Sequence, residues 1–503
     1  ERTLLRRLAV FAGGWTLEAA EPVCSGNGFE ADDVLDVLTQ LVNKSLVMAE
    51  RGRGDESRYF LLEMTRQFAR DKLSESNEIE SVRNRHLDHF CVLAETAEPK
   101  LFSANREPSL ECLASEHDNL RAALRWAAEC GKTEMELRLA GALFWFWYHR
   151  GYLIEGCRWL EEALSHSSAD VLTAARAKAL LGAGHLAFYR EDLDTARTRL
   201  EESIRLWRDI GNQRYLAYTL IWFGMVANNP VECSSRLHES ITLFRTSGDD
   251  WGMAVAIFYL GLNGIIGQTE QRDQAHARSL LEESASRFRR LGDKWQLGGV
   301  LFYLGVAASN EKDAATAQLR MEEALAISRQ VGDKWRICAI LTRLGNLARA
   351  EGNFQRAQAL YTEGLALVRE LGRPRIYVLS DLGYVSLAQG DLKHATAFLV
   401  ESLQIAVQQN QTTIIPTVLA GLAGVAYAEG NIEHAVRLLG AVGRLTESIQ
   451  GSKLESVNQT IYDQNLAAAR AQLDETAFNV AWGAGHQMTL DDAIACALEE
   501  AGR

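Results

Sequence analysis

Apolar residues recur along most of the chain with the spacing of amphipathic helices, and from about residue 134 the helices themselves recur with a period near 40. In each repeat the first helix carries one small residue, and a second apolar helix follows. The small residues are separated by 40, 37, 44, 40, 38 and 40 positions: Gly184, Gly224, Gly261, Gly305, Gly345, Gly383 and Ala423. In five repeats an alanine follows twelve residues later, at Ala196, Ala317, Ala357, Ala395 and Ala435. The third repeat has Ala277 sixteen residues after its glycine, which predicts a loop insertion at 268–273.

Small residues at fixed places let two antiparallel helices approach closely, but one such pair cannot bury its own apolar face. Stacked pairs bury it, so the pattern predicts a mostly α fold, a right-handed α-solenoid with a concave inner face. These placements resemble tetratricopeptide repeats in a long-period version, and we predict seven to eight repeats over residues 134–447. The turns at 248–251, 292–295 and 332–335 read Gly-Asp-x-Trp. Glycine is expected to end one helix, aspartate to cap the next, and tryptophan to pack between layers.

Residues 1–73 have a different pattern, which predicts a small winged-helix domain. Two amphipathic helices, near 3–11 and 31–41, precede a strand pattern at 45–50. A glycine-rich turn and a second strand at 58–62 follow, and a helix begins at Glu63. Helix, helix and β-hairpin in this order are typical of a winged helix whose hairpin is the wing.

The charges of this domain do not favour DNA reading. Residues 1–73 carry 10 basic and 12 acidic residues, and the helix before the wing carries Asp32, Asp33 and Asp36. A recognition helix with that face would repel phosphates. We therefore expect a winged helix that packs against protein, with DNA reading as the alternative.

Two further helical segments frame the repeats. Residues 74–133 predict a helical connector of two or three helices, with Pro99 and Pro108 between them. Residues 448–503, where the repeat pattern fades, predict a helical C-terminal cap that closes the open end of the solenoid.

Composition supports a helical protein and excludes some functions. Only six prolines occur, and a net charge of −13 argues against a general grip on nucleic acid. The longest apolar runs, such as 139–148, are about half of a bilayer span, so no membrane segment is expected. Eight cysteines without a CxxC pair and the lack of a leader pattern favour a cytoplasmic protein with reduced thiols. The chain opens at Glu1 inside a helical pattern, so we expect a fragment.

Catalytic motifs are weak, and we predict that this fragment is not an enzyme. The Gly-Lys-Thr at 131–133 lacks the glycine that a phosphate loop requires upstream. The match of 182–187 to a dinucleotide motif lies within a repeat helix, without a preceding strand. His86 and His89 could share a helix face, but no further ligand completes a metal site. We expect no cofactor and no metal in this fragment.

The concave face remains as the candidate site. If the small residue of each first helix is position eight, position four is aliphatic in every repeat and faces the core. Positions six and thirteen then lie opposite, with positions nine and twelve adding to that side in the fifth repeat. We predict that a ligand or partner groove is formed by Tyr189, Trp222, Tyr259, Tyr303, Arg343, Asn346 and Arg349. These side chains suit stacking and hydrogen bonding, although packing between neighbouring repeats would explain the aromatic ones equally well.

The order of winged helix, connector, repeats and cap resembles the carboxy-terminal half of bacterial STAND-type ATPase transcription regulators of the LuxR-like and AfsR-like kinds. Local matches lie at 8–15, 61–69, 116–124, 481–482 and 490–493. The resemblance implies a missing upstream domain that holds ADP or ATP and packs against the winged helix. Many relatives carry Met-His-Asp after the wing, where this chain has Leu61, Leu62 and Glu63. Leucine cannot make the histidine contact to a nucleotide.

The leading hypothesis is a non-catalytic sensor and scaffold portion of a signal-responsive regulator. A protein partner or small-molecule inducer would bind the solenoid groove and control the missing ATPase module, without direct contact to nucleic acid or membrane. One alternative is a DNA-binding winged-helix protein with a repeat-based interaction arm. Another is a nucleotide hydrolase, but we expect this chain alone to hydrolyse no nucleotide.

Overall fold

The computed structural model describes residues 1–51, 57–168, 172–227, 229–266, 274–371, 375–449, 454 and 456–501. The chain divides into two compact units, Glu1–Asp293 and Lys294–Arg503. The centre of the predicted wing turn, at residues 52–56, and the predicted loop insertion at 268–273 lie outside the described residues.

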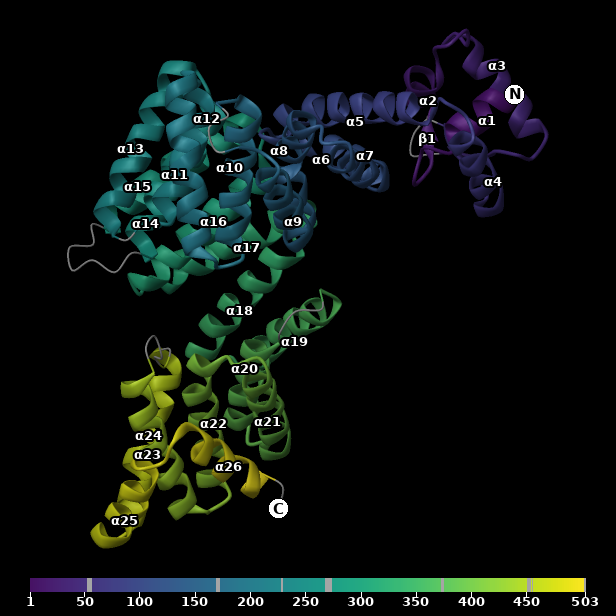
Figure 1. The fold of residues 1–503 in the computed structure, drawn as a ribbon. Helices are drawn as coiled ribbons and strands as arrows, with labels where there is room; N and C mark the ends of the chain where they lie inside the picture. The colour runs from purple at the N-terminus through teal and green to yellow at the C-terminus, as the bar shows by residue number, and fades with distance from the viewer. Residues whose placement is uncertain are drawn as a thin grey trace. The chain divides into compact units, whose positions relative to one another are not determined.

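The first unit opens with a winged-helix arrangement of four helices and a small sheet (Figure 1). The elements are α1 (Arg2–Leu8), β1 (Trp15–Thr16), α2 (Leu17–Cys24), α3 (Asp33–Asn43), β2 (Met48–Arg51), β3 (Ser57–Phe60) and α4 (Glu63–Ser74). The three antiparallel strands have the order β1-β3-β2, with Trp15 opposite Tyr59 and Ala49 opposite Tyr59 on the other side. The predicted hairpin is confirmed, while α2 and β1 are additions to the prediction.

The connector contains α5 (Ile79–Leu101), α6 (Arg106–Ser115) and α7 (His117–Glu129). We expected Pro99 and Pro108 between helices, and this was wrong: Pro99 lies in the last turn of α5 and Pro108 in the first turn of α6. A first-turn proline removes no intrahelical hydrogen bond, because the first N–H groups of a helix have no partner within it. Helix α5 contacts α2 through Arg85, whose Nε donates to the Val23 carbonyl, and α8 of the repeats through Glu95, which accepts from Arg138.

The rest of the first unit is a stack of antiparallel helices (Figure 1). These are α8 (Thr133–Arg150), α9 (Leu153–Ser165), α10 (Ala174–Tyr189), α11 (Leu193–Ile210), α12 (Gln213–Met225), α13 (Pro230–Ser247), α14 (Asp250–Ile266) and α15 (Gln274–Leu291). The even-numbered helices are the first helices of the predicted repeats, and each packs against the odd-numbered helix that follows it.

The second unit continues the same pattern. Its elements are α16 (Lys294–Asn310), α17 (Ala314–Gln330), α18 (Lys334–Ala350), α19 (Phe354–Glu370), α20 (Ile376–Ala388), α21 (Leu392–Gln408), η1 (Thr412–Ile414), α22 (Ile415–Ala428), α23 (Ile432–Ser448), α24 (Ser456–Gln472), α25 (Glu475–His486) and α26 (Leu490–Ala501). The last three helices pack on α21, α22 and α23. A single buried apolar cluster joins these elements, so α24–α26 bury the end of the repeat stack.

The small residues act as the sequence predicts. A Cβ added to Gly184 would lie 2.5 Å from Leu200 Cγ and 3.1 Å from the carbonyl oxygen of Ala196, twelve residues on. Gly383 has the same relation to Leu399 and Ala395. Each glycine therefore lets the second helix approach to backbone contact, which is why glycine and alanine recur at this spacing.

Buried serines tie the two helices of a pair at the other end. In four repeats a second-helix hydroxyl donates to a first-helix carbonyl at 2.8–2.9 Å: Ser203 to Ala177, Ser240 to Ala217, Ser284 to Ala254 and Ser402 to Ile376. This recurrence of serine was not predicted from the sequence.

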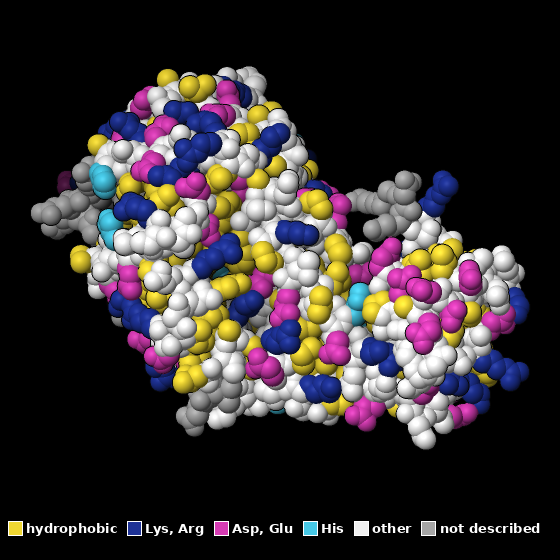
Figure 2. Space-filling model, turned by 90° about the horizontal axis from the view of Figure 1, so that it is seen from above, with side chains coloured by type: hydrophobic (Ala, Val, Ile, Leu, Met, Phe, Trp, Pro, Cys, Tyr) yellow, Lys and Arg dark blue, Asp and Glu magenta, His cyan; other side chains and the backbone are white. Residues whose placement is uncertain are grey.

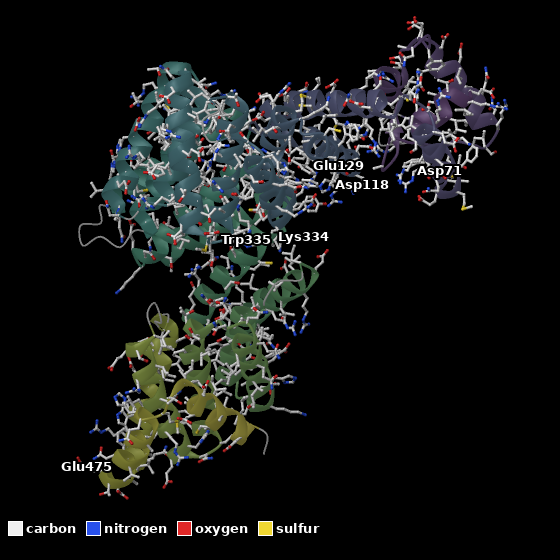
Figure 3. The ribbon with its side chains drawn as sticks, in the orientation of Figure 1. Asp71, Asp118, Glu129, Lys334, Trp335 and Glu475 are labelled. Atoms are coloured by element: carbon white, nitrogen blue, oxygen red, sulfur yellow. The ribbon has the colours of Figure 1, made fainter. Side chains whose placement is uncertain are left out.

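The Gly-Asp-x-Trp turns are confirmed in part. Gly248, Gly292 and Gly332 have φ of 69°, 73° and 69°, the left-handed region that glycine adopts without strain. Asp249 Oδ1 accepts from Gly252 N at 2.8 Å, as a helix cap does. Trp251 is buried, but Trp335, labelled in Figure 3, is 53% exposed on α18. The prediction that the tryptophan packs between layers is therefore wrong for the third turn.

Candidate functional site

Three of the predicted groove residues meet on successive first helices of the first unit. Trp222 of α12 lies between Tyr189 of α10 and Tyr259 of α14, with ring centroids 5.7 and 5.1 Å away. The hydroxyl oxygens of Tyr189 and Tyr259 are 3.2 Å apart, so the two tyrosines share a hydrogen bond across Trp222. Trp222 is 2% exposed, whereas both tyrosines are half-buried. We call these three residues the aromatic row.

His185 lies beneath the aromatic row and was not predicted. Its ring is 0% exposed, 4.2 Å from the Trp222 ring and 4.9 Å from the Trp145 ring. Among the described residues, neither ring nitrogen of His185 has a hydrogen-bond partner, and the same holds for Trp145 Nε1. Burial lowers the pKa of His185 from its ordinary value to about 3, so the ring stays neutral. A histidine at an otherwise apolar helix position was the available signal in the sequence.

The other four predicted residues lie in the second unit. Tyr303 of α16 is half-buried, and burial raises its pKa although Arg336 and Arg343 oppose the change. Arg343 is exposed on α18, and Asn346 accepts a hydrogen bond from the buried Tyr361 hydroxyl. Tyr303 and Arg343 thus interact electrostatically, while Asn346 is bound to Tyr361 of α19.

Arg349 is covered by the C-terminal helices. Its side chain is 1% exposed, Nη2 donates to Asn458 Oδ1 of α24 at 2.8 Å, and the guanidinium lies over the Tyr384 ring at 5.3 Å. A Cβ added to Gly424 of α22 would meet Asn465 of the same helix α24. Helix α24 thus fills the inner side of α18 and α22 where an external ligand was expected.

Part of the inner side of the first unit is also covered by the chain itself. The segment between α5 and α6, residues 102–105, places Phe102 against rings of α8, α12 and α14. Phe102 is 5% exposed. The aromatic row lies further along α12 and α14 and includes Tyr189 of α10, and both of its tyrosines stay half-buried.

Two cavities lie away from the aromatic row. One of about 770 Å³ opens on the first unit and is lined mainly by the α8–α9 turn, α9 and three arginines, Arg121, Arg158 and Arg190. A smaller one, of about 200 Å³, lies in the winged helix and includes Leu61 and Glu63. Leu62, which aligns with the histidine of the Met-His-Asp motif, is 51% exposed before α4.

The surface of α3 is acidic and partly apolar. Its first turn carries Asp33 and Asp36, and Leu35 beside them is 46% exposed. Figure 2 shows basic and acidic side chains intermixed over the face in view, without a patch of one sign. Among the described residues, no group of three His, Cys, Asp or Glu side chains could hold a metal ion, and no helix is long and apolar enough to cross a membrane.

Comparison with known proteins places a winged helix-turn-helix domain at residues 1–74. A Mycobacterium tuberculosis protein, named provisionally as an HTH-type transcriptional regulator, is 33% identical over 276 residues. The match spans 53% of this chain and 31% of that protein, so the chain covers less than a third of this relative. An uncharacterized protein of the same organism is 44% identical over 91 residues, 18% of this chain and 23% of that protein.

One solved structure supports the fold over nearly the whole chain. It is the Signal Transduction ATPase with Numerous Domains (STAND) protein with a tetratricopeptide repeat sensor from Pyrococcus horikoshii. The superposition has a TM-score of 0.58 at 16% identity and covers 95% of this chain and 65% of that one. At that identity the likeness concerns the fold: a winged helix followed by a tetratricopeptide-like α-solenoid.

Proposed function

We propose that this chain is the sensor and scaffold portion of a signal-responsive bacterial transcription regulator. In this proposal the inner face of the repeats binds an inducer or a partner protein. The observation that carries it is the aromatic row, in which half-buried Tyr189 and Tyr259 flank Trp222 above the unpartnered His185. Flat rings with polar tips stack on a ligand and hydrogen-bond to it, and a buried polar group without a partner in the protein can take one from a ligand.

The regulated element would be a nucleotide-dependent ATPase module outside this chain. The likeness in fold to a STAND protein with a tetratricopeptide repeat sensor supports this part, and the M. tuberculosis relative extends well beyond the matched region. Ligand binding can switch such a module only if the ligand prefers one of two arrangements of the repeats. A row contributed by three successive repeats suits this role, because a change in their relative placement alters all three contacts together.

The test begins with a thermal-shift screen of the purified chain against small molecules and peptides, followed by calorimetry on each hit. Replacing Trp222 and Tyr259 together by alanine should weaken binding at least about tenfold, because it removes a partly exposed ring and the buried ring that positions it. Tyr377→Ala is the matched control, because Tyr377 of α20 is 54% exposed and lies outside the aromatic row. Equal affinity for the double variant and the control would remove the groove assignment.

A second candidate function is direct DNA binding by the winged helix. The match of residues 1–74 to a winged helix-turn-helix domain favours it, whereas the acidic first turn of α3 opposes it. A gel-shift titration of the whole chain at low salt separates the two. Tight binding that weakens steeply with salt, and that is lost in a Thr39→Ala, Gln40→Ala variant of the exposed α3 face, would favour the DNA reader.

A further inference from the structure

The segment between α5 and α6 is held against the repeats in the way that a bound peptide would be. We call residues 102–105 the elbow. Phe102 lies among four rings, with centroid distances of 4.8 Å to Tyr218, 5.1 Å to Trp145, 6.0 Å to Trp251 and 6.3 Å to Phe144. The rings come from α8, α12 and α14, which are first helices of different repeats, so several repeats contact the elbow at once.

A charged side chain on each side of the elbow also has a partner on the repeats. On α6, Arg106 pairs with the buried carboxylate of Asp293, to which Trp251 Nε1 donates at 2.8 Å. Arg106 is 5% exposed and Asp293 is 1% exposed, so this ion pair is out of water. A buried pair of this kind is very sensitive to the loss of one partner, because the other charge then stays buried alone.

On α5, Glu98 completes the set. Its carboxylate accepts from Lys178 Nζ of α10 at 2.5 Å and from the Tyr215 hydroxyl of α12 at 3.0 Å. The side chain is buried, and burial raises the pKa of Glu98 although both contacts oppose the change. The acid, the aromatic ring and the guanidinium thus follow one another at intervals of four residues. The first two meet groups on the first helices, and Arg106 meets Asp293 in the turn after α15.

The elbow leaves one buried hydrogen-bond donor of this surface without a partner. Trp145 is 4% exposed, and its Nε1 donor has no hydrogen-bond partner among the described residues, although Phe102 packs against its ring. A buried N–H without an acceptor costs about 1–3 kcal/mol relative to a satisfied one. A ligand that placed a carbonyl or hydroxyl oxygen there would bind this surface better than the elbow does.

We propose that the elbow is an internal occupant of the repeat surface, and that the partner is a protein segment presenting an acidic, an aromatic and a guanidinium side chain in the order of Glu98, Phe102 and Arg106. The segment takes the elbow's place and adds an acceptor for Trp145. The inference rests on the proposed function, since it names the partner of the same inner face. Release of the elbow frees the end of α5, whose other end contacts the winged helix.

The test uses the whole chain and a fluorescein-labelled peptide with the sequence of residues 95–108, followed by fluorescence anisotropy. In the wild-type chain the tethered elbow competes at an effective concentration of about 1 mM, so weak or no binding is expected. Phe102→Ala in the chain empties the space between the four rings around Phe102. It should tighten peptide binding about 100-fold, because the competing elbow then loses the energy of a buried phenylalanine. The same peptide with alanine in place of its phenylalanine should not bind.

A milder variant guards against unfolding. Arg106→Lys keeps a charge opposite Asp293, and it should tighten peptide binding by a smaller factor than Phe102→Ala does. Circular dichroism checks that both variants keep their helices. Equal peptide affinity for wild type and both folded variants, or no binding to either variant at about 1 mM, overturns the inference. The aromatic-row assignment is judged separately, by the Trp222→Ala and Tyr259→Ala variant in the ligand screen.

Discussion

The buried imidazole of His185 allows a quantitative test of how the aromatic row is built. Burial lowers the pKa of His185 from 6.5 to about 3. Between these two pH values the imidazole of His185 is protonated in the unfolded chain but not in the folded one. Stability therefore falls as the pH falls, beginning near the unfolded pKa and continuing towards the folded one. At neutral pH and above, the two states bind the same number of protons at this residue, and the contribution vanishes.

The size follows from the linkage relation. The slope is about 1.4 kcal/mol per pH unit, so going from about pH 7.5 to about pH 5 removes about 2 kcal/mol from the free energy of unfolding. Burial also lowers the pKa of His86 to about 3, which adds a second loss of the same sign. Replacing His185 by phenylalanine should remove only the first contribution, since the new ring suits the aromatic surroundings and does not titrate.

The assay is urea denaturation at both pH values, followed by tryptophan fluorescence, because Trp145 and Trp222 adjoin the substituted ring. At about pH 7.5 the variant should be more stable by about 1 kcal/mol, because two unpaired ring nitrogens leave the core. Its loss on acidification should be smaller than that of wild type by about 2 kcal/mol. His238→Phe, at an exposed position of α13, is the control and should keep the wild-type loss. A His185→Phe variant with an unchanged pH dependence would refute the burial argument.

Two other predictions concern packing and a buried charge. Gly345→Ala should destabilise the second unit by about 2 kcal/mol, because the new Cβ would lie 2.3 Å from the Tyr361 ring. Gly364→Ala, whose Cβ would meet nothing closer than 3.8 Å, should instead stabilise it by up to about 1 kcal/mol, and thermal denaturation checks both. Glu78→Gln should cost about 3 kcal/mol, because Arg7, 1% exposed, loses its carboxylate partner. Hydrogen bonds from Arg7 and Arg6 lower the pKa of Glu78 to about 2, so this difference should be present above about pH 4.5 and fade as the pH falls towards 2, which denaturation at several pH values measures.

The repeat array could be predicted from the sequence because its packing rule is local and repeated. Gly184 touches Leu200, sixteen residues away, and the same distance separates Gly383 from Leu399. Short-range contacts of this kind produce a repeating pattern of residues in the sequence. The first strand left none, because β1 has two residues and pairs with Tyr59, more than forty positions later. Pro22 lies within α2 and hid that short helix.

The candidate site was only partly predictable, because a helical wheel gives the side of a helix and not what covers it. The stripe through positions six and thirteen does bring Trp222, Tyr189 and Tyr259 together. Arg349 was predicted in the same way, but its guanidinium donates a hydrogen bond to Asn458, 109 positions later in the chain. The cover over Trp251 comes from Phe102, in a connector that has no repeat pattern.

Both covers follow from one physical requirement. Charged and aromatic groups on the inner face of stacked helices are partly out of water, and buried polar groups need partners. The chain supplies them where it can: Arg106 for Asp293 in the first unit, and Asn458 for Arg349 in the second. Polar character alone is therefore a poor guide to a ligand site in this fold, since both of these charged inner residues have a partner within the chain. Both nitrogens of His185 and Nε1 of Trp145 are among the buried groups that have no partner within the described chain, and they lie beside the aromatic row and the elbow, where an external group could pair with them.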